Sequence, residues 1–205
     1  MSHVPSFTIP PKKIVVITAP SGSGKSTVVR KLLSQKPELA FSISCTTRAK
    51  RPGEIDGDHY HFINNTEFQK KVSAGEFAEY EEVYPGQFYG TLKSEIERIW
   101  KNRQVALFDI DVKGAESLKK LYGNDALVLF VAPPDKETLA RRLTNRNTES
   151  KSTLKTRIAK SEKELEYQSK ADKVVVNRDF DICYMNVKNI ITNFLQPVVV
   201  MQHHH

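Results

Sequence analysis

A lysine and two hydroxyl residues follow closely spaced glycines near the start of the chain, in the run Gly22-Ser23-Gly24-Lys25-Ser26-Thr27. Glycines let the backbone turn its N–H groups toward a bound anion, and the amino end of a following helix adds a positive dipole. A lysine in this position reaches the β- and γ-phosphates of a nucleotide, and the adjacent serine hydroxyl ligates Mg2+. The run therefore predicts a binding site for nucleotide phosphates.

The residues around this run supply the elements that must position it. Ile14 to Thr18 is a β-branched segment that predicts a buried strand, and the residues after Lys25 have the apolar period of a helix that ends near Pro37. Strand, loop and helix are the context of the P-loop pattern G-x-x-x-x-G-K-[ST]. Its first glycine is Ala19 here, where a Cβ requires a negative φ or a local adjustment of the backbone. The alternative is a flexible turn with a solvated lysine. The context favours a P-loop formed by Ala19, Pro20, Ser21, Gly22, Ser23, Gly24, Lys25, Ser26 and Thr27.

Composition limits the class of protein. A chain of 205 residues predicts one domain, or one core with inserted subdomains. The net charge of +7 suits an anionic partner, but the basic residues are not packed into one run, which argues against an arm that binds nucleic acid. Cys45 and Cys183 form no disulfide framework and favour a reducing cytosol. We expect no signal peptide and no membrane span, and we interpret His203 to His205 as the remnant of an expression tag.

Strands and helices alternate along most of the chain. The patterns predict further strands over residues 41–46, 105–109, 127–132 and 173–177. They predict helices over residues 94–102, 112–122, 136–144, 154–167 and 184–195, with a polar loop over 145–153. This alternation is typical of an α/β fold, in which a parallel sheet of the P-loop NTPase type has helices on both faces. Ligands of such folds bind beyond the carboxyl ends of the strands.

The region from about residue 45 to residue 91 interrupts this alternation, and we predict that it forms an inserted subdomain. Its predicted elements are a strand-like segment over 59–63, a helix over 66–74 capped by Asn65 or Thr66, and a strand over 77–84.

Four separated motifs resemble one enzyme family: Ala19 to Thr27, Ser44 to Glu54, Gly57 to Phe62 and Phe108 to Gly114. With Tyr89-Gly90-Thr91, they make the chain similar to guanylate kinase from about Ile14 to Leu195. The resemblance implies the reaction ATP + GMP = ADP + GDP in purine nucleotide metabolism and GMP recycling, with Mg2+ as cofactor. It also implies a single domain with a core (12–44, 92–135 and 172–196), a GMP-binding subdomain (45–91) and a helical lid (136–171).

The acceptor site that the resemblance implies must bind a phosphate and a base. Arg48 and Arg51 lie three residues apart in a loop with Gly and Pro, so both guanidinium groups can converge on one phosphate. Guanine presents two N–H donors beside the O6 acceptor, and a carboxylate with nearby hydroxyls complements that edge. The resemblance assigns the phosphate to Arg48, Arg51, Tyr60 and Tyr89, with Glu54 orienting the arginines. It assigns the base to Glu79, Ser44, Thr91 and Asp111.

Phosphoryl transfer depends on positioning and charge neutralisation more than on covalent chemistry. Asp109 ends an apolar strand, where a Walker-B acid would act on Mg2+ through water while the Ser26 hydroxyl ligates the ion. The resemblance places Asn177 near the adenine of ATP. Taken alone, each arginine of the predicted lid would be a solvated surface residue. The catalytic residues that the resemblance implies are Lys25, Arg48, Arg142, Arg146 and Arg157.

Two alternatives stay open at this stage. Interaction modules that resemble guanylate kinase usually lack the P-loop residues that this chain keeps. A nucleotide kinase of another specificity, or a different P-loop ATPase, would have no need of Glu79 together with the Arg48 and Arg51 loop. We expect ATP and GMP as partners, no nucleic acid or membrane partner, and a cytoplasmic location. The sequence leaves open whether the protein is a monomer or a homo-oligomer.

Overall fold

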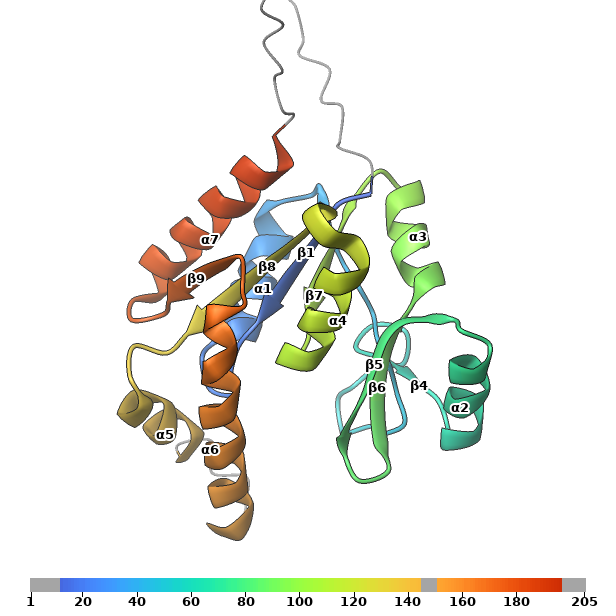
Figure 1. Cartoon of the computed structure of the whole chain (residues 1–205), viewed down its shortest axis with the longest axis horizontal. Helices are drawn as coiled ribbons and strands as arrows, with labels where there is room; N and C mark the ends of the chain where they lie inside the picture. The colour runs from blue at the N-terminus through green and yellow to red at the C-terminus, as the bar shows by residue number, and fades with distance from the viewer. Residues whose placement is uncertain (1–11, 145–150, 197–205) are drawn as a thin grey trace, which may run out of the picture.

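A five-stranded parallel sheet forms the centre of the molecule (Figure 1). The computed structural model describes residues 12–144 and 151–196, except the side chains of 151–157. Because all pairs in the sheet are parallel, the carboxyl ends of the strands lie at one edge. In spatial order the strands are β2 (Leu39–Phe41), β7 (Val105–Asp109), β1 (Ile14–Thr18), β8 (Ala126–Ala132) and β9 (Lys173–Val176).

Helices cover both faces of this sheet, which explains why β1 is buried along its whole length. Val15 and Ile17 belong to one hydrophobic cluster, and Ile14 and Val16 belong to a second one, as the two-residue period of a strand requires. The predicted α/β fold with helices on both faces is confirmed. The first cluster includes residues of α1 (Lys25–Gln35) and α7 (Phe180–Leu195), and the second those of α3 (Lys93–Lys101) and α4 (Val112–Tyr122).

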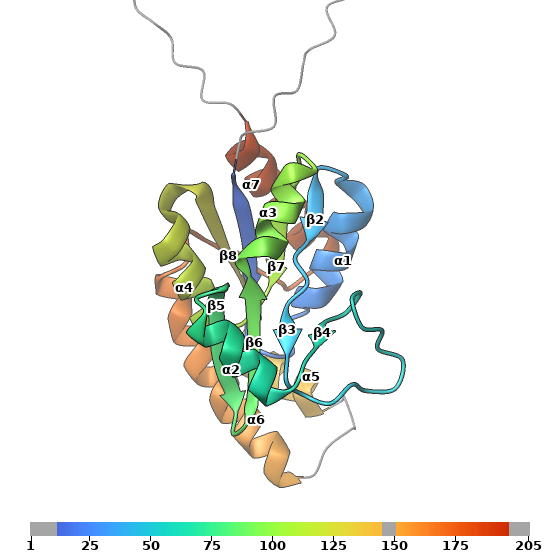
Figure 2. The ribbon, with the colours of Figure 1, turned by 90° about the vertical axis from the view of Figure 1, so that its right-hand side faces the viewer.

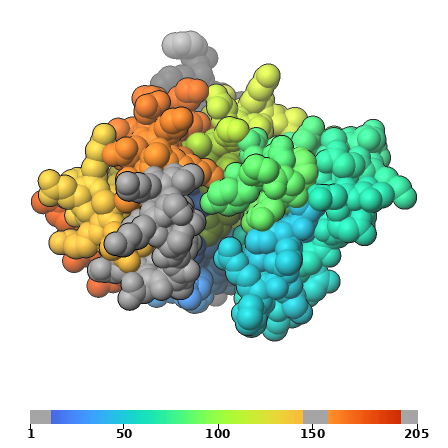
Figure 3. Space-filling view, turned by 90° about the horizontal axis from the view of Figure 1, so that it is seen from below, coloured from blue at the N-terminus to red at the C-terminus, as the bar shows by residue number. Residues whose placement is uncertain are grey.

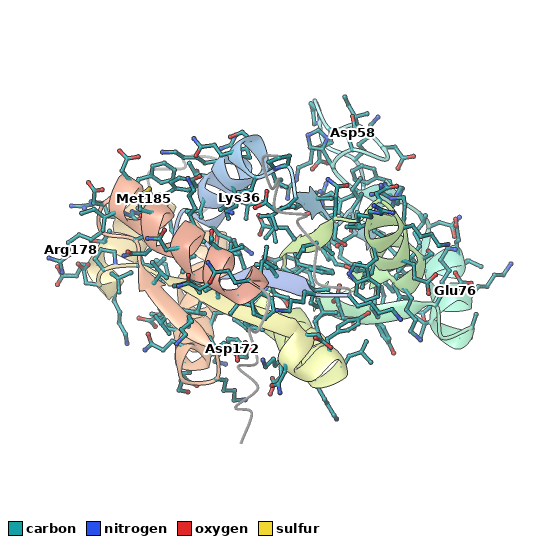
Figure 4. All side chains as sticks on the ribbon, turned by 90° about the horizontal axis from the view of Figure 1, so that it is seen from above. Lys36, Asp58, Glu76, Asp172, Arg178 and Met185 are labelled. Carbon is teal, nitrogen blue, oxygen red and sulfur yellow. The ribbon has the colours of Figure 1, made fainter. Side chains whose placement is uncertain are left out.

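A second sheet is built from the residues between β2 and α3 (Figure 2). It encloses a small core in which Phe68 stacks on Phe77. The labelled Asp58 and Glu76 lie in this part of the chain, at the end of the molecule opposite to Arg178 (Figure 4). Its elements are the strands β4 (His61–Phe62), β3 (Cys45–Thr46), β6 (Gln87–Leu92) and β5 (Phe77–Tyr84), in spatial order, and the helix α2 (Asn65–Ser73).

Two further helices, α5 (Lys136–Thr144) and α6 (Lys151–Leu165), lie at the lower left of Figure 1, and the β5–β6 hairpin lies at the lower right. The two helices contact each other. Short 3-10 helices, η1 (Gly123–Asp125) and η2 (Glu166–Ser169), precede β8 and β9. None of the helices in the described ranges is both long and apolar enough to cross a membrane.

Two predicted strands differ from the structure. The strand predicted over 41–46 is two strands, because the chain leaves the central sheet after Phe41 and Cys45 then pairs with β4 and β6. The strand predicted over 59–63 is shorter, because Tyr60 forms only an isolated bridge with Asp56 before β4 begins.

Helix starts also differ, because capping residues lie upstream of the predicted ones. Asn64 caps α2 by accepting a hydrogen bond from the backbone N–H of Glu67 at 2.8 Å, so the predicted caps at Asn65 and Thr66 are wrong. Asp179 likewise caps α7, which begins before the predicted residue 184. The helix α6 begins inside the loop predicted over 145–153, and residues 145–150 and 203–205 lie outside the described residues.

Replacing Phe68 with Ala tests the small core of the second sheet. Phe68 is fully buried, and its ring centroid lies 4.4 Å from that of Phe77, so truncation leaves a cavity. We expect the free energy of unfolding, measured by urea denaturation, to fall by about 3–5 kcal/mol. Leu121→Ala is the control, because Leu121 is 53% exposed and its truncation changes stability by less than about 0.5 kcal/mol. Equal effects of the two substitutions would contradict this assignment of the core.

Candidate active site

A cleft of about 820 Å³ opens at the carboxyl edge of the central sheet. Its walls come from the loop between β1 and α1, from the second sheet and from α6. Seen from below, α5 and α6 form one side of the molecule and the second sheet forms the other (Figure 3). The predicted site residues that line the cleft are all nine from Ala19 to Thr27, with Ser44, Arg51, Tyr60, Glu79, Tyr89, Asp109 and Asp111.

The loop between β1 and α1 has the backbone geometry of a phosphate cradle. Gly22 and Gly24 have φ values of 91° and 89°, which residues with a Cβ rarely adopt. Ala19 is buried and keeps a negative φ, as predicted. Asn177 supports the loop, because its Nδ2 donates to the carbonyl of Ser23 at 2.7 Å. A Cβ on Gly24 would lie 2.5 Å from the same nitrogen, so only glycine fits there.

Lys25 and Ser26, at the start of α1, both contact Asp109 at the end of β7. The Nζ of Lys25 lies 2.6 Å from Oδ1 of Asp109 and donates to the carbonyl of Ile110 at 3.0 Å. The hydroxyl of Ser26 donates to Oδ2 of Asp109 at 3.0 Å. Hydroxyl and carboxylate oxygens are ligands that Mg2+ prefers. The ammonium group of Lys25 already lies against this carboxylate, so the carboxylate is placed to bind a cation. Ser26 and Asp109 therefore fit a Mg2+ site beside the cradle.

Arg48 is held in one orientation by its neighbours. Its two Nη atoms donate to the Glu54 carboxylate at 2.8 Å each, and its Nε donates to the Tyr89 hydroxyl at 3.1 Å. The guanidinium also lies 5.4 Å and 5.6 Å from the ring centroids of Tyr60 and Phe62. The hydrogen bonds from Arg48 lower the pKa of Glu54 to about 2, and those same bonds raise the pKa of Arg48. Glu54 therefore stays ionised and orients Arg48.

The side chain of Arg51 is less constrained by contacts than that of Arg48. Its side chain is exposed and lines the cleft, and the Glu54 carboxylate fixes only its backbone N–H, at 2.7 Å. The Arg48 side chain is 9% exposed and is absent from the cleft lining within the described residues. Arg51 therefore presents its guanidinium group to the cleft, whereas that of Arg48 is held by Glu54 and Tyr89.

Glu79 is the buried acid of the cleft. It is 7% exposed and lies opposite Thr91 in the β5–β6 hairpin. The hydroxyls of Ser44 and Thr91 are 3.0 Å apart. Burial raises the pKa of Glu79 to about 7, the Thr91 hydroxyl opposes this rise, and the nearby Asp111 carboxylate adds to it. Glu79 and Ser44 therefore line the cleft together, and the fully buried Thr91 contacts Ser44 from behind its described lining.

Gly114 of α4 makes room for the Glu79 carboxylate. A Cβ at Gly114 would lie 2.9 Å from Oε2 of Glu79 and 3.1 Å from Cδ1 of Ile110. Asp111 caps α4 by accepting the backbone N–H of Gly114 at 2.9 Å. Sequence reasoning gave Gly114 no role. The available signal was the glycine itself, because a glycine in a helix lowers helix stability by about 1 kcal/mol relative to alanine.

Of the three predicted lid arginines, Arg142 is the one whose side chain lies within the described residues. Arg142 Nη2 donates to the backbone carbonyl of Asn177 at 3.2 Å, and Asn177 is 5% exposed beneath the cradle. Arg146 and the side chain of Arg157 lie outside the described residues. The contact of Asn177 with adenine stays a prediction. Three residues of α6 also line the cleft: Lys160, Ser161 and Glu164. Sequence reasoning missed them, because charged residues occur on every side of this helix.

Gly114→Ala tests the packing of the base pocket. The added Cβ displaces the Glu79 carboxylate, whereas the helix propensity of α4 improves. We expect calorimetry to show GMP binding weakened by about tenfold or more, with ATP binding unchanged. Ser117→Ala is the matched control, because Ser117 is an exposed residue of the same helix. Unchanged GMP binding in Gly114→Ala would exclude this role for Gly114.

Comparisons with known proteins agree with this geometry. The family model described as guanylate kinase matches residues 11–194. The chain is 48% identical to the guanylate kinase of Salinibacter ruber, over 91% of this chain and 99% of that protein. It is 47% identical to that of Porphyromonas gingivalis, over 89% and 98%. The crystal structure of guanylate kinase from Anaplasma phagocytophilum has a TM-score of 0.75 and 29% identity, and the match covers 93% of this chain and 90% of that one. The chain therefore belongs to the guanylate kinase family and is a phosphotransferase.

Proposed function

We propose that the cleft transfers the γ-phosphoryl group of ATP to GMP, with the release of ADP and GDP. One observation carries this proposal: Lys25 of the phosphate cradle and Glu79 of the buried pocket line the same cleft. A P-loop alone fits many nucleoside triphosphates, and a carboxyl group with hydroxyls alone fits many ligands with N–H donors. Their presence in one cleft fits a reaction between ATP and a guanine nucleotide.

In this proposal the cradle from Ala19 to Thr27 holds the triphosphate of ATP. The two glycines with positive φ and the amino end of α1 supply backbone N–H donors. Lys25 exchanges its ion pair with Asp109 for the β- and γ-phosphates. Ser26 and Asp109 hold Mg2+, which when bound neutralises charge on the phosphates. We also propose that the adenine lies near Asn177.

The phosphate of GMP binds to Arg51, Tyr60 and Tyr89 on the wall formed by the second sheet. The guanidinium group of Arg48 is bound mainly by other groups of the protein. Four of its five N–H groups donate within the protein, two to Glu54 and one each to Tyr89 and the Ala49 carbonyl, which leaves one on Nη2. Arg48 therefore contributes its positive charge and one hydrogen bond to the GMP phosphate.

The guanine base binds at Glu79. The ionised carboxylate accepts the N1–H and N2–H donors, with Asp111 beside the amino group. Ser44 and Thr91 lie near O6, and because one of these hydroxyls donates to the other, one proton of the pair is left to donate to O6. Adenine presents a lone pair at N1, which would face the buried carboxylate without a proton between them. A site of this kind rejects the wrong base by a factor on the order of ten thousand.

The transfer step itself requires alignment of the two nucleotides. An oxygen of the GMP phosphate attacks the γ-phosphorus while the bond to the β,γ-bridging oxygen breaks, and ADP leaves with that electron pair. We propose that the lid arginines neutralise the charge that spreads over the transferred group. These residues are Arg142, Arg146 and Arg157. Closure of the lid also excludes water, which would otherwise hydrolyse ATP.

We propose that the chain is one domain with three working parts. Residues 12–44, 92–135 and 172–196 form the core, residues 45–91 bind GMP, and residues 136–171 form the lid. Its partners are ATP and GMP, and its role is purine nucleotide metabolism and GMP recycling. A cytoplasmic location agrees with the two free cysteines, Cys45 and Cys183, which are both buried.

An assay of ADP release with GMP, AMP, CMP and UMP tests the proposed function. We expect kcat/KM for GMP to exceed that for AMP by roughly ten thousand. Lys25→Ala should lower kcat by about 100-fold or more without a change in the unfolding midpoint, because Lys25 points into the cleft. Equal turnover of all four nucleotides would exclude the base pocket, and normal turnover by Lys25→Ala would exclude the cradle.

The affinity for GMP should depend on the ionisation of Glu79. Burial raises the pKa of Glu79 to about 7 in the free protein, and two N–H donors stabilise the carboxylate in the complex and lower this pKa. Binding of GMP therefore releases a proton. We expect the Kd for GMP to rise by about tenfold per pH unit as the pH falls below this pKa, and to stay constant above it.

Glu79→Gln is the control for this pH dependence. The second ionisation of the GMP phosphate, with a pKa of about 6, occurs with both proteins, so the difference between the two profiles isolates Glu79. The substitution should also lower kcat/KM for GMP by roughly 2–4 kcal/mol of transition-state binding, with little change in KM for ATP. Identical pH profiles of the two proteins would show that Glu79 does not read the base.

A further inference from the structure

The chain enters the second sheet through residues 42–44 and leaves it at Lys93, where α3 begins directly after β6. The segment 42–44 follows β2, precedes β3 and passes beside α3 (Figure 2). Ser44, which lies near O6 of guanine in the proposed complex, is the last residue of this segment. A group that fixes the segment therefore also fixes one of the residues that meet the base.

Glu95 of α3 is a buried carboxylate that holds this segment. Its Oε1 accepts the backbone N–H of Ile43 at 3.0 Å, and the residue is 7% exposed. Glu95 has no role in the function proposed above. Because α3 packs on the central sheet through the fully buried Ile96 and Ile99, this acceptor is anchored in the core.

Arg98, one turn further along α3, compensates the charge of Glu95. Its Nε donates to Oε2 of Glu95 at 2.8 Å, and its Nη2 donates to Oε1 at 2.9 Å. A buried charge is costly unless a partner and hydrogen bonds satisfy it, and here three N–H donors do so. These donors keep the Glu95 carboxylate in one orientation beside Ile43.

Three successive residues of the segment are held by three different elements. The Ser42 N–H donates to a carbonyl of β7 at 2.9 Å, and the Ile43 N–H donates to Glu95 of α3. The Ser44 hydroxyl lies 3.0 Å from that of Thr91 in β6. Because ordering the backbone costs entropy, a segment outside both sheets keeps one conformation only where such contacts offset that cost. Glu95 supplies the middle contact, directly before the residue that lines the cleft.

The position of Ser44 matters because the hydroxyl pair has one proton to offer to O6 of the base. Ser44 is the member of the pair that lines the cleft, whereas Thr91 is fully buried. An O–H···O hydrogen bond requires an oxygen–oxygen distance of about 2.5–3.0 Å. A small displacement of Ser44 therefore weakens its bond to the base.

We propose that Glu95 is a positioning residue for base recognition, which holds the Ile43 N–H from α3 and so places the Ser44 hydroxyl opposite O6 of GMP. The inference rests on the proposed function, because it assigns Glu95 to the binding of the guanine base. The acceptor oxygen next to Ile43 carries the role. A side chain of the same length with an acceptor oxygen should therefore replace Glu95, and one without it should not.

Glu95→Gln and Glu95→Met test this role. Both substitutions keep the length of the side chain, but only glutamine keeps an oxygen that accepts the Ile43 N–H. In steady-state kinetics, we expect Glu95→Met to raise KM for GMP by about fivefold, because one hydrogen bond to the base is weakened. Glu95→Gln should stay within about twofold of the original protein. KM for ATP and kcat should be the same in all three proteins, because the contact with the base is equally strong before and during transfer.

A double-mutant cycle with Ser44→Ala separates positioning of the base site from a general loosening of the fold. Ser44→Ala removes the hydroxyl and should by itself raise KM for GMP by about fivefold. If Glu95 acts through that hydroxyl, adding Glu95→Met to Ser44→Ala should raise KM for GMP by less than about twofold more.

Glu97→Gln and Glu97→Met are matched controls, because Glu97 is an exposed residue of the same helix. Both should leave KM for GMP unchanged. If Glu95→Met does not fold, Glu95→Asp provides a second variant, which keeps the charge for Arg98 and withdraws the oxygen from Ile43, with the same expected rise. Folding of each variant is checked by its unfolding midpoint.

Four results would overturn the positioning role. They are an unchanged KM for GMP in Glu95→Met, equal rises in the Gln and Met variants, equal rises in KM for GMP and ATP, or an undiminished rise when Glu95→Met is added to Ser44→Ala. The third result would mean that the whole fold is loosened, and the fourth that Glu95 acts on GMP without Ser44. Failure of the proposed function is distinguishable, because it would appear as absent GMP phosphorylation by the original protein.

Discussion

The parallel pairing of β1 with its two neighbours is the constraint on which the cleft depends. Ile17 lies opposite Asp109 of β7, and Thr18 lies opposite Phe130 of β8. Strands far apart in the sequence therefore end at one edge of the sheet, where Lys25 and Ser26 contact Asp109. The same edge brings Asn177, after β9, to the cradle. Burial of every residue of β1 stabilises this register, because a slip by one residue would exchange the two hydrophobic clusters.

Two glutamates of the second sheet region show how one residue type takes opposite roles. Glu54 accepts two hydrogen bonds from Arg48 and stays ionised well below neutral pH. Glu79 is buried beside another acid, Asp111, and ionises only near neutrality. The first glutamate already has its partner within the protein, and the second is placed so that a ligand must supply one.

Sequence patterns predicted the central sheet well, because short β-branched runs bounded by turn residues have few other interpretations. They also predicted that Lys25, Ser26 and Asp109 would meet, since each stands next to a strand end. The contact of Asn177 with the cradle was beyond such reasoning. It joins residues more than a hundred positions apart, and neither the residue type nor the local pattern indicates a partner. The break after Phe41 was missed for a similar reason, because an apolar pattern does not tell which of two sheets a residue joins.

The two cysteines lie in different cores, Cys45 with Phe68 and Phe77 in the second sheet, and Cys183 under the central one. Burial raises the pKa of both thiols to about 11. Thiolate is the form that reacts with peroxides and alkylating reagents, and at neutral pH it makes up only about one part in ten thousand of such a thiol. Each sulfur is therefore protected by packing as well as by protonation. Both thiols are therefore poor targets for such reagents, and a reagent that does modify either sulfur reports that the surrounding core has opened.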